Sequence, residues 1–436
     1  MPKVNPFKPF SPVPHGLFVG RIREIDCLEA HLAQTKAGHP SSFMVTGERG
    51  IGKSSLLLFV RFVAQGGMDV DGGKLNYLVI DTDIDARTTQ FGLVRKIEFG
   101  LRSALAKSEP AREFLKKTWE FLQRIQVQGT GFKSDAGQKS DELMLEEFSY
   151  SLAQTCDRVC GVTEDGADFG STHDGVLILI DEADNASKDL QLGSFLKLLN
   201  ERLQRRGCDR VMFGLAGLSG LRDVLRTSHP SSLRMFEELP LDRLSNTEVG
   251  RVVELCLKRA NETADPQIEI TSEAEEILVL LAEGYPHFIQ QFGYSAFAVD
   301  SDDIIDGDDV RGGALGKGGA LERIGDRYYR DDFYNRIQKD NYRQVLRIMA
   351  DSLDDWVTKQ AIRDRFKGKQ SALDNAIYAL RDRHIIQSKE GVRGVYRLRH
   401  KGFALWIKYY TTDPDDVQQT LNGDGDGVAE GGTDTE

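Results

Sequence analysis

The stretch "GERGIGKSS", residues 47–55, constrains the fold of this chain more than any other part of the sequence. It stands between the apolar run Phe43–Thr46 and a leucine-rich pattern of helical composition. Glycines in such a loop permit positive φ and let successive N–H groups face an anion at a helix N-terminus. The pattern G-x-x-x-x-G-K-[ST] is complete in Gly47, Gly52, Lys53 and Ser54. The context of strand, loop and helix therefore predicts a phosphate-binding loop, and not merely a glycine-rich turn.

A phosphate-binding loop that works with magnesium needs a carboxylate at the end of a neighbouring strand, because Mg²⁺ prefers oxygen ligands. The stretch "VLILIDEAD" (residues 176–184) supplies one directly after a buried apolar run. We expect Asp181 and the Ser54 hydroxyl to bind the metal, and Glu182 to polarise the attacking water. An ordinary helix start is the alternative for this Asp-Glu pair, and the phosphate loop disfavours it. Asp184 is expected to be solvated.

Four apolar runs punctuate the first half of the chain, at residues 43–46, 75–83, 176–181 and 211–217. Continuous apolar runs are typical of strands buried on both faces of a parallel sheet that helices cover. The sequence thus predicts an α/β fold with a doubly wound parallel sheet. The long interval 86–175 has mostly helical patterns, and we read it as an elaboration of this core whose role composition does not reveal.

Downstream of Ser245 the pattern becomes helical and predicts a lid. The acidic and then glycine-rich stretch at residues 300–319 predicts a flexible joint. The expected organisation is a proline-rich arm (1–16), a P-loop α/β domain (17–243), a helical lid (244–299), a linker with a connecting helix (300–340), a C-terminal domain (341–411) and a disordered acidic tail (412–436).

The C-terminal domain has three helical patterns followed by two strand-like segments around "SKEGVRG", which predicts a winged helix. The whole chain has a net charge of −12, but residues 342–410 hold 15 Lys and Arg against 7 Asp and Glu. A basic surface suits contacts to a DNA backbone. The residues expected at DNA are Lys367, Lys369, Gln370, Ser371 and Arg393. Packing against protein is the alternative for this domain.

Several other classes of protein are excluded or disfavoured. No apolar run approaches the roughly 20 residues that a membrane-spanning helix needs, so no membrane contact is expected. Five cysteines, an odd number, and an N-terminus without a signal-peptide pattern favour the cytoplasm. Cys156 and Cys160 lie one helical turn apart, and we read them as two semi-buried thiols. The eight histidines form no metal-binding cluster, so no protein-ligated transition metal is expected.

Four motifs carry a resemblance to a known family. Together "LFVGRIREID", "GERGIGKSS", "VLILIDEAD" and "GYPHFIQQFG" resemble the AAA+ ATPases of the origin-recognition and initiator clade, and also the STAND signalling ATPases. The resemblance implies a lid that clamps ATP and Mg²⁺ against the sheet. Initiators usually have a sensor arginine where this chain has "HFIQQ". This difference makes the chain more similar to the STAND ATPases than to the initiators at that position.

The resemblance also implies the residues that contact the nucleotide. Phe18, Val19 and Arg21 would line the base pocket from one side and Pro286 from the other. The loop residues expected at the phosphates are Gly47, Arg49, Gly50, Ile51, Gly52, Lys53, Ser54 and Ser55. Arg234 matches the region where related ATPases hold an arginine finger that enters a neighbouring subunit. A plain surface arginine is an equal alternative.

Three functions remain open on the sequence. The first is an ATP-driven switch that repositions a winged helix on DNA or on a partner, with a homo-oligomer or a partner effector protein as the alternative assemblies. The second is a STAND-type signalling ATPase, although no sensor repeat is visible. The third is a winged-helix regulator without activity, which the presence of Lys53, Ser54, Asp181 and Glu182 disfavours.

Overall fold

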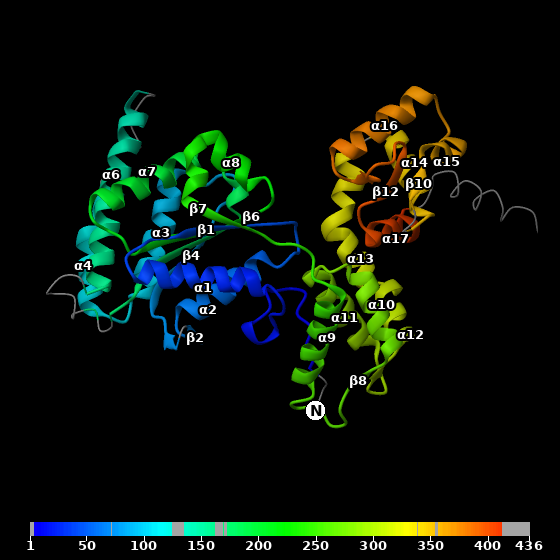
Figure 1. The fold of residues 1–436 in the computed structure, drawn as a ribbon, viewed down its shortest axis with the longest axis horizontal. Helices are drawn as coiled ribbons and strands as arrows, with labels where there is room; N and C mark the ends of the chain where they lie inside the picture. Colours follow the sequence, from blue (N-terminus) through cyan, green and yellow to red (C-terminus); the bar gives the residue numbers. More distant parts are fainter. Residues whose placement is uncertain are drawn as a thin grey trace, which may run out of the picture. The chain divides into compact units, whose positions relative to one another are not determined.

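The computed structural model describes residues 4–70, 72–123, 135–161, 169, 172–337, 339–353 and 356–411, without the side chains of 135–140 and 332. The chain divides into two compact units, of which one comprises residues 10–248 and the other residues 249–436 together with residues 1–9 (Figure 1). The predicted tail 412–436 lies outside the described residues. Among the described residues, no helix is both long enough and apolar enough to cross a membrane.

The first unit is built on a five-stranded parallel sheet in the order β4-β5-β6-β1-β7. Its strands are β1 (Ser42–Thr46), β4 (Tyr77–Asp83), β5 (Gly175–Asp181), β6 (Val211–Gly217) and β7 (Phe236–Pro240). The predicted α/β class and parallel sheet are confirmed. Strand β7 was not predicted, because an edge strand of which Phe236 and Leu239 alone are buried lacks the apolar run of a central strand.

Helices cover both faces of this sheet (Figure 1). Helices α1 (Ile22–Lys36) and α2 (Lys53–Ala64) lie on one face. On the other face α3 (Gln90–Ala104), α6 (Asp135–Val159) and α7 (Leu192–Arg205) enclose the main apolar core. The remaining elements of the unit are η1 (His15–Leu17), β2 (Asp69–Val70), β3 (Gly73–Lys74), α4 (Glu109–Thr118), η3 (Ala183–Asn185), α8 (Leu221–Ser228) and η4 (Pro230–Met235).

The predicted elaboration between the second and third apolar runs is helical, and it supplies much of that core. Trp119 follows α4 and is fully buried, with its indole Nε1 donating a 3.2 Å hydrogen bond to Thr155 Oγ1 on α6. Its ring packs edge-on against Phe148, which stacks in turn on Phe195 of α7. The elaboration is thus part of the folded unit, because its aromatic side chains complete the apolar face of the sheet.

The second unit begins with helices. Helix α9 (Asn246–Ala260) starts at the end of the first unit, and α10 (Ser272–Ala282), α11 (Pro286–Val299), α12 (Gly307–Leu315) and α13 (Ala320–Ile324) follow. Two short strands, β8 (Glu269–Ile270) and β9 (Ile304–Ile305), pair in parallel.

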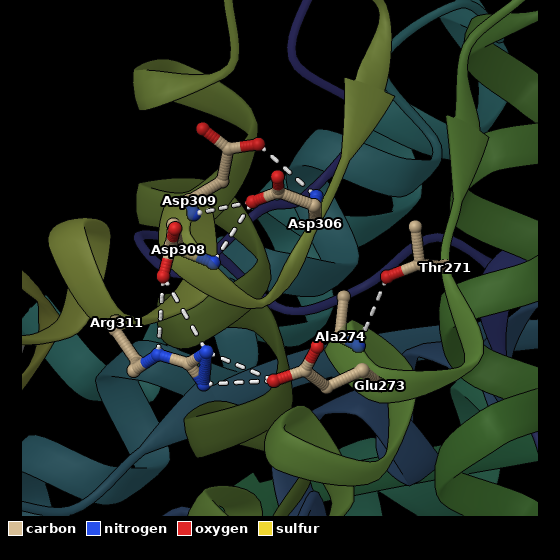
Figure 2. A network of polar contacts seen from close by, with 7 residues as sticks. All are labelled: Thr271, Glu273, Ala274, Asp306, Asp308, Asp309 and Arg311. Atoms are coloured by element: carbon tan, nitrogen blue, oxygen red, sulfur yellow. Dashed lines mark hydrogen bonds and ion pairs between the residues drawn. The ribbon is translucent and has the colours of Figure 1, made fainter.

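The flexible joint expected at residues 300–319 is wrong, because β9 and α12 occupy most of it. The acidic residues cap the helix: Asp306 Oδ1 accepts hydrogen bonds from the N–H groups of Asp308 and Asp309, and Asp309 Oδ2 accepts from Asp306 N (Figure 2). Such a capping box satisfies N–H groups that the helix start would leave free. Arg311 forms an ion pair with Glu273 at 2.8 Å and so links α12 to α10 (Figure 2).

The glycines of this stretch serve close packing and not disorder. A Cβ at Gly313 would lie 2.6 Å from the backbone of Ser295 on α11, so the absence of a side chain lets the two helices approach. Composition suggested a joint because aspartate and glycine are common in loops, whereas here they cap and pack a helix.

The C-terminal part of the second unit contains the three helices and the hairpin that the sequence predicts, together with strand β10 and helix α17, which were not predicted. Helix α14 (Asp340–Ala350), strand β10 (Val357–Thr358), helices α15 (Lys359–Arg365) and α16 (Gln370–Asp382), the hairpin β11 (Ile386–Ser388) and β12 (Val395–Leu398), and helix α17 (Lys401–Tyr410) follow one another. The three strands form an antiparallel sheet in the order β10-β12-β11. The π-helical turns η5 (Gly325–Tyr329) and η6 (Asp332–Arg336) precede these elements.

The proline-rich arm is anchored to both units in turn. Within the second unit, Asn5 Nδ2 donates to Tyr294 O at 2.9 Å and Lys8 N donates to Gln290 Oε1 at 2.7 Å. The Phe7 ring, 2% exposed, packs on the bare backbone of Gly293. Residues from Phe10 onward belong to the first unit, where η1 and α1 continue the chain.

Candidate functional site

The loop between β1 and α2 has the backbone that its glycines predict. Gly50 and Gly52 have φ values of 80° and 102°, in the left-handed region that side chains disfavour. Gly52 is the N-cap of α2, and Leu56 N donates the first helical hydrogen bond to its carbonyl at 2.9 Å. The preceding N–H groups at the helix start therefore have no partner within the helix, and an anion placed there would accept their hydrogen bonds.

Lys53 lies folded over this loop. Its Nζ donates hydrogen bonds to the carbonyls of Gly47 at 3.0 Å and of Glu48 at 2.9 Å. Burial lowers the pKa of the Lys53 ammonium, and the nearby carboxylates of Asp181 and Asp184 oppose that shift. An ammonium held by neutral carbonyls at the mouth of the loop can exchange one of them for a phosphate oxygen.

Ser54 and Asp181 meet across the end of the sheet. The Ser54 hydroxyl donates a 2.6 Å hydrogen bond to Asp181 Oδ2, and Glu182 N donates to Asp181 Oδ1 at 2.8 Å. Ser54 follows β1 in the chain, and Asp181 is the last residue of β5. The two residues meet because the carboxyl ends of parallel strands lie at the same edge of a sheet.

The donor set fits magnesium. A hydroxyl and a carboxylate are the hard oxygen ligands that Mg²⁺ prefers, and it usually completes its shell with water and substrate phosphates. Among the described residues, no group of three or more His, Cys, Asp or Glu side chains could hold a metal. The pair Ser54 and Asp181 thus fits an ion that arrives with a nucleotide, and not a permanent protein cage.

Glu182 stands at the beginning of η3 with φ 52°, in the left-handed region. Its side chain is exposed and accepts a 3.3 Å hydrogen bond at Oε2 from Asn185 Nδ2. The same Asn185 amide donates to Ile84 O, just after β4, at 3.4 Å. Asn185 therefore orients the candidate base. The sequence did not predict this role of Asn185, because Ile84, whose carbonyl it contacts, lies 101 residues away. The one indication in the sequence is that Asn185 follows Glu182 by three residues.

Asp184 is not simply solvated, as the sequence suggested. It is half-buried, and its Oδ1 accepts a 2.9 Å hydrogen bond from Leu218 N, directly after β6. A Cβ at Gly217 would lie 2.7 Å from the same oxygen. Asp184 thus links the turn after β5 to the end of β6, and so holds two neighbouring strand ends in register beside Lys53.

The segment expected at the base is packed against the loop and α2. Arg21 has φ 64°, and its Nη2 donates to Ile51 O within the loop at 3.2 Å. Burial lowers the pKa of the Arg21 guanidinium. Phe18 stacks on Phe59 of α2 with ring centroids 5.1 Å apart, and Val19 is half-buried.

The other predicted loop residues are placed as follows. Arg49 is exposed, Ile51 is buried with its side chain in the core, and Ser55 Oγ accepts a 3.3 Å hydrogen bond from Val13 N of the arm. Ile51 can therefore serve an anion through its backbone alone. Ser55 links the phosphate loop to the arm, a contact that the sequence did not predict.

Two further predicted residues belong to other elements. Arg234 is exposed in η4 and makes no hydrogen bond or ion pair with the part of the chain that the structure describes. Pro286 is the first residue of α11 in the second unit, after Gly284 at φ 75°. The roles of both residues at a nucleotide stay predictions.

The residues predicted at DNA are all exposed. Lys367, Lys369, Gln370 and Ser371 lie at or just before the start of α16, and Arg393 lies in the turn between β11 and β12. Two of them make contacts within the domain. Lys367 N donates to Gln344 Oε1 at 3.2 Å. Gln370 Nε2 donates to Asp374 Oδ1 at 2.9 Å, where Lys359 also forms an ion pair at 2.7 Å.

Comparison with known proteins shows which domain contains these residues. Residues 17–207 match the family model described as the AAA ATPase domain. No curated protein matches the chain. Among solved structures, the ORC2 protein of Aeropyrum pernix, solved with ADPNP and ADP, is 14% identical, with a TM-score of 0.54 over 97% of this chain and 99% of that one.

Two further structures overlay less closely. The RuvB branch-migration motor of Thermotoga maritima has a TM-score of 0.44 at 14% identity, covering 93% of this chain and all of that one. The Aeropyrum pernix ORC1 protein in complex with DNA has a TM-score of 0.43 at 16% identity, covering 94% and 98%.

The phosphate loop before α2 and the acidic pair that begins at the last residue of β5 both lie within residues 17–207, which match the AAA ATPase domain. The fold of the chain is similar to that of the ORC2 protein.

Proposed function

We propose that this protein binds ATP with Mg²⁺ and hydrolyses it at the loop between β1 and α2. The observation that carries the proposal is the 2.6 Å hydrogen bond from Ser54 to Asp181, which brings a metal-binding hydroxyl and carboxylate together beside the loop. Mg²⁺, when bound with the nucleotide, would neutralise charge on the β- and γ-phosphates.

The chain's own residues then have separate tasks. The free N–H groups at the start of α2 receive phosphate oxygens, and Lys53 exchanges its loop carbonyls for the β- and γ-phosphates. Glu182, oriented by Asn185, accepts a proton from the attacking water. Asp181 orients the Ser54 hydroxyl through their hydrogen bond, and these two residues would hold the Mg²⁺ ion.

The proposal extends to the second unit as a switch. Nucleotide binding would close the lid through Pro286 and reposition the C-terminal domain, which we infer to be a winged helix. The order of three helices and a hairpin supports this, and the exposed side chains at the start of α16 and in the hairpin turn support DNA as its partner. Of the solved proteins, the ORC1 relative is recorded with DNA.

The STAND-type signalling ATPase is the second candidate. One observation favours it: Asp374 holds both Gln370 and Lys359, so part of the face expected at DNA is already satisfied within the domain. In that case the winged helix would pack against protein. Assembly through Arg234 is compatible with either function, because the exposed guanidinium is available to a neighbouring subunit.

A cytoplasmic location belongs to the same proposal. All five cysteines are free thiols, which suits a reducing compartment.

The experiment that tests the proposal measures ATP hydrolysis with and without duplex DNA, together with the mass of the oligomer in ATP analogue. The switch predicts hydrolysis that duplex DNA stimulates and that Lys53→Ala abolishes. Hydrolysis that ignores DNA, with no salt-sensitive DNA binding, would favour the signalling ATPase. Absence of nucleotide binding would contradict both and leave a regulator without activity.

A further inference from the structure

Three of the five cysteines gather in one place in the first unit. Cys156 lies in the last turn of α6, Cys160 follows the end of that helix, and Cys208 lies between α7 and β6. Their exposed fractions are 2%, 5% and 4%. The nucleotide site does not use this cluster, since it lies by the start of β6, whereas the phosphate loop faces the ends of the strands.

The Cys156 sulfur lies near each of the other two sulfurs. Cys156 Sγ lies 3.9 Å from Cys160 Sγ, and the Cys208 thiol is within hydrogen-bonding reach of Cys156. Cys160 is at a helix end: its N–H still donates to Cys156 O at 2.9 Å, and Gly161 follows at φ 65°. Cβ atoms one helical turn apart are about 5–6 Å from one another, more than a disulfide allows. Because Cys160 ends the helix, a small opening of the last turn closes that difference.

The two thiols differ in acidity, which matters for their reactivity. The hydrogen bond from Cys156, and the charge of nearby Arg210, lower the pKa of Cys160 against the effect of burial. The same pairing, together with Cys208, raises the pKa of Cys156. The thiolate is the nucleophile in cysteine oxidation, so the lowered pKa of Cys160 favours the attacking role that its place at the helix end also gives it.

We infer that Cys160 is a site of oxidation by hydroperoxides and that Cys156 closes a disulfide with it. The geometry assigns the roles: a sulfur at the helix end can move toward the oxidant, and the second sulfur waits 3.9 Å away. The proposed oxidation does not depend on ATP hydrolysis, so its test is independent of the proposed function.

The chemistry balances in two steps. The Cys160 thiolate attacks one oxygen of hydrogen peroxide, the O–O bond breaks, and the departing hydroxide takes a proton from solvent to give water and Cys160 sulfenic acid. Cys156 sulfur then attacks the sulfenic sulfur, and the S–O bond breaks. The departing hydroxide takes the Cys156 proton, which gives a second water and the disulfide. Peroxide is reduced and the two thiols are oxidised.

Cys27 provides an internal competitor within the same chain. It lies on α1 and is more exposed than the three clustered cysteines, and burial together with Glu237 raises the pKa of its thiol. If access alone governed oxidation, Cys27 would react first. If the thiol pair governs it, Cys160 reacts first although it is better buried.

The test treats the reduced, full-length protein with hydrogen peroxide, blocks remaining thiols at timed intervals and maps the peptides by mass spectrometry without reduction. We expect free Cys160 to be lost several-fold faster than free Cys27, because the pKa of the Cys160 thiol is lowered and that of the Cys27 thiol is raised. We also expect a peptide in which Cys156 and Cys160 have lost two hydrogens. This comparison needs no variant, so misfolding cannot obscure it.

Three variants sharpen the assignment. Cys156→Ser should stop at a Cys160 sulfenic acid that a dimedone-type reagent traps. Cys160→Ser should remove the fast phase, and Cys208→Ser, a matched buried control, should leave the Cys156–Cys160 disulfide in place. The inference would be overturned if Cys27 were oxidised before Cys160. It would also be overturned if Cys160→Ser formed a disulfide between Cys156 and Cys208 as fast as the unchanged protein forms its own disulfide.

Discussion

Ser54 and Asp181, separated by 127 positions in the sequence, share a 2.6 Å hydrogen bond at one edge of the parallel sheet. Ser54 belongs to the first turn of α2, and Asp181 is the last residue of β5. The sheet order brings these two strand ends to the same edge, with β6 between β5 and β1. The candidate metal site is thus a consequence of the topology.

The first prediction concerns the magnesium carboxylate. Asp181→Asn keeps the size of the side chain but removes its charge, so the Mg²⁺ concentration needed for half-maximal ATP hydrolysis should rise about 10- to 100-fold. A titration of the hydrolysis rate with Mg²⁺ measures this. Asp189→Asn, at an exposed residue of the following loop, is the matched control and should titrate as the unchanged protein does.

The second prediction concerns the base. Glu182→Gln should bind ATP with unchanged affinity and hydrolyse it about 10²- to 10⁴-fold more slowly, because the amide cannot accept the proton of the water. Asn185→Ala should lower kcat less, and leave KM unchanged, because Asn185 positions Glu182 and does not touch the nucleotide. A rise in KM without loss of kcat in either variant would contradict these roles.

The third prediction tests the link between strand ends. Asp184→Ala removes the acceptor of the Leu218 N–H, so we expect the free energy of unfolding to fall by about 1–3 kcal/mol. Denaturant unfolding measures it. Asp184→Asn retains an acceptor oxygen, so its free energy of unfolding should fall less. An equal fall in both variants would show that the hydrogen bond is not the cause.

The fourth prediction addresses DNA. If Lys367 and Lys369 contact phosphates, replacing both with alanine should reduce the slope of log affinity against log salt by about two, since each contact contributes roughly 0.9. Fluorescence anisotropy at several salt concentrations measures that slope. Lys116 and Lys117, an exposed pair on α4, serve as the control. Equal slopes for both double variants would show that the start of α16 does not contact DNA.

The fifth prediction concerns the arm. A side chain at Gly293 would collide with the Phe7 ring, so Gly293→Ala should displace the arm and lower the free energy of unfolding by about 1–3 kcal/mol. Gly312→Ala is a control in a neighbouring helix, where the nearest atom to the new Cβ lies 3.7 Å away. That change should stabilise the protein by up to about 1 kcal/mol. Equal stability of the two variants would mean that Phe7 is not held at Gly293.

The nucleotide loop was predictable because its information is local. A strand, a glycine pattern and a helix follow within a dozen residues, and the acidic pair ends its own apolar run, so each motif identifies its own place in the fold. The contacts that orient the site are not local. Asn185 reaches Ile84 and Asp184 reaches Leu218 through the folded sheet, and one sequence carries no record of either pairing.

The errors elsewhere have similar physical causes. Strand β7 escaped notice because the edge of the sheet requires few apolar residues. Residues 300–319 looked like a joint because Asp and Gly are frequent in turns, yet Asp306 and Asp309 cap α12 and Gly313 packs it on α11. Composition does not show whether an aspartate caps a helix, because capping depends on which N–H groups its carboxylate faces in the folded chain.

The central claim is that Ser54 and Asp181 serve one metal ion together. A double-mutant cycle of Mg²⁺-dependent ATP hydrolysis, with Ser54→Ala, Asp181→Asn and both, measures their coupling most directly. The account predicts that the double variant is scarcely slower than the worse single variant, because either change already disables the same site. Losses that multiply independently, or hydrolysis that proceeds equally well without Mg²⁺, would contradict it.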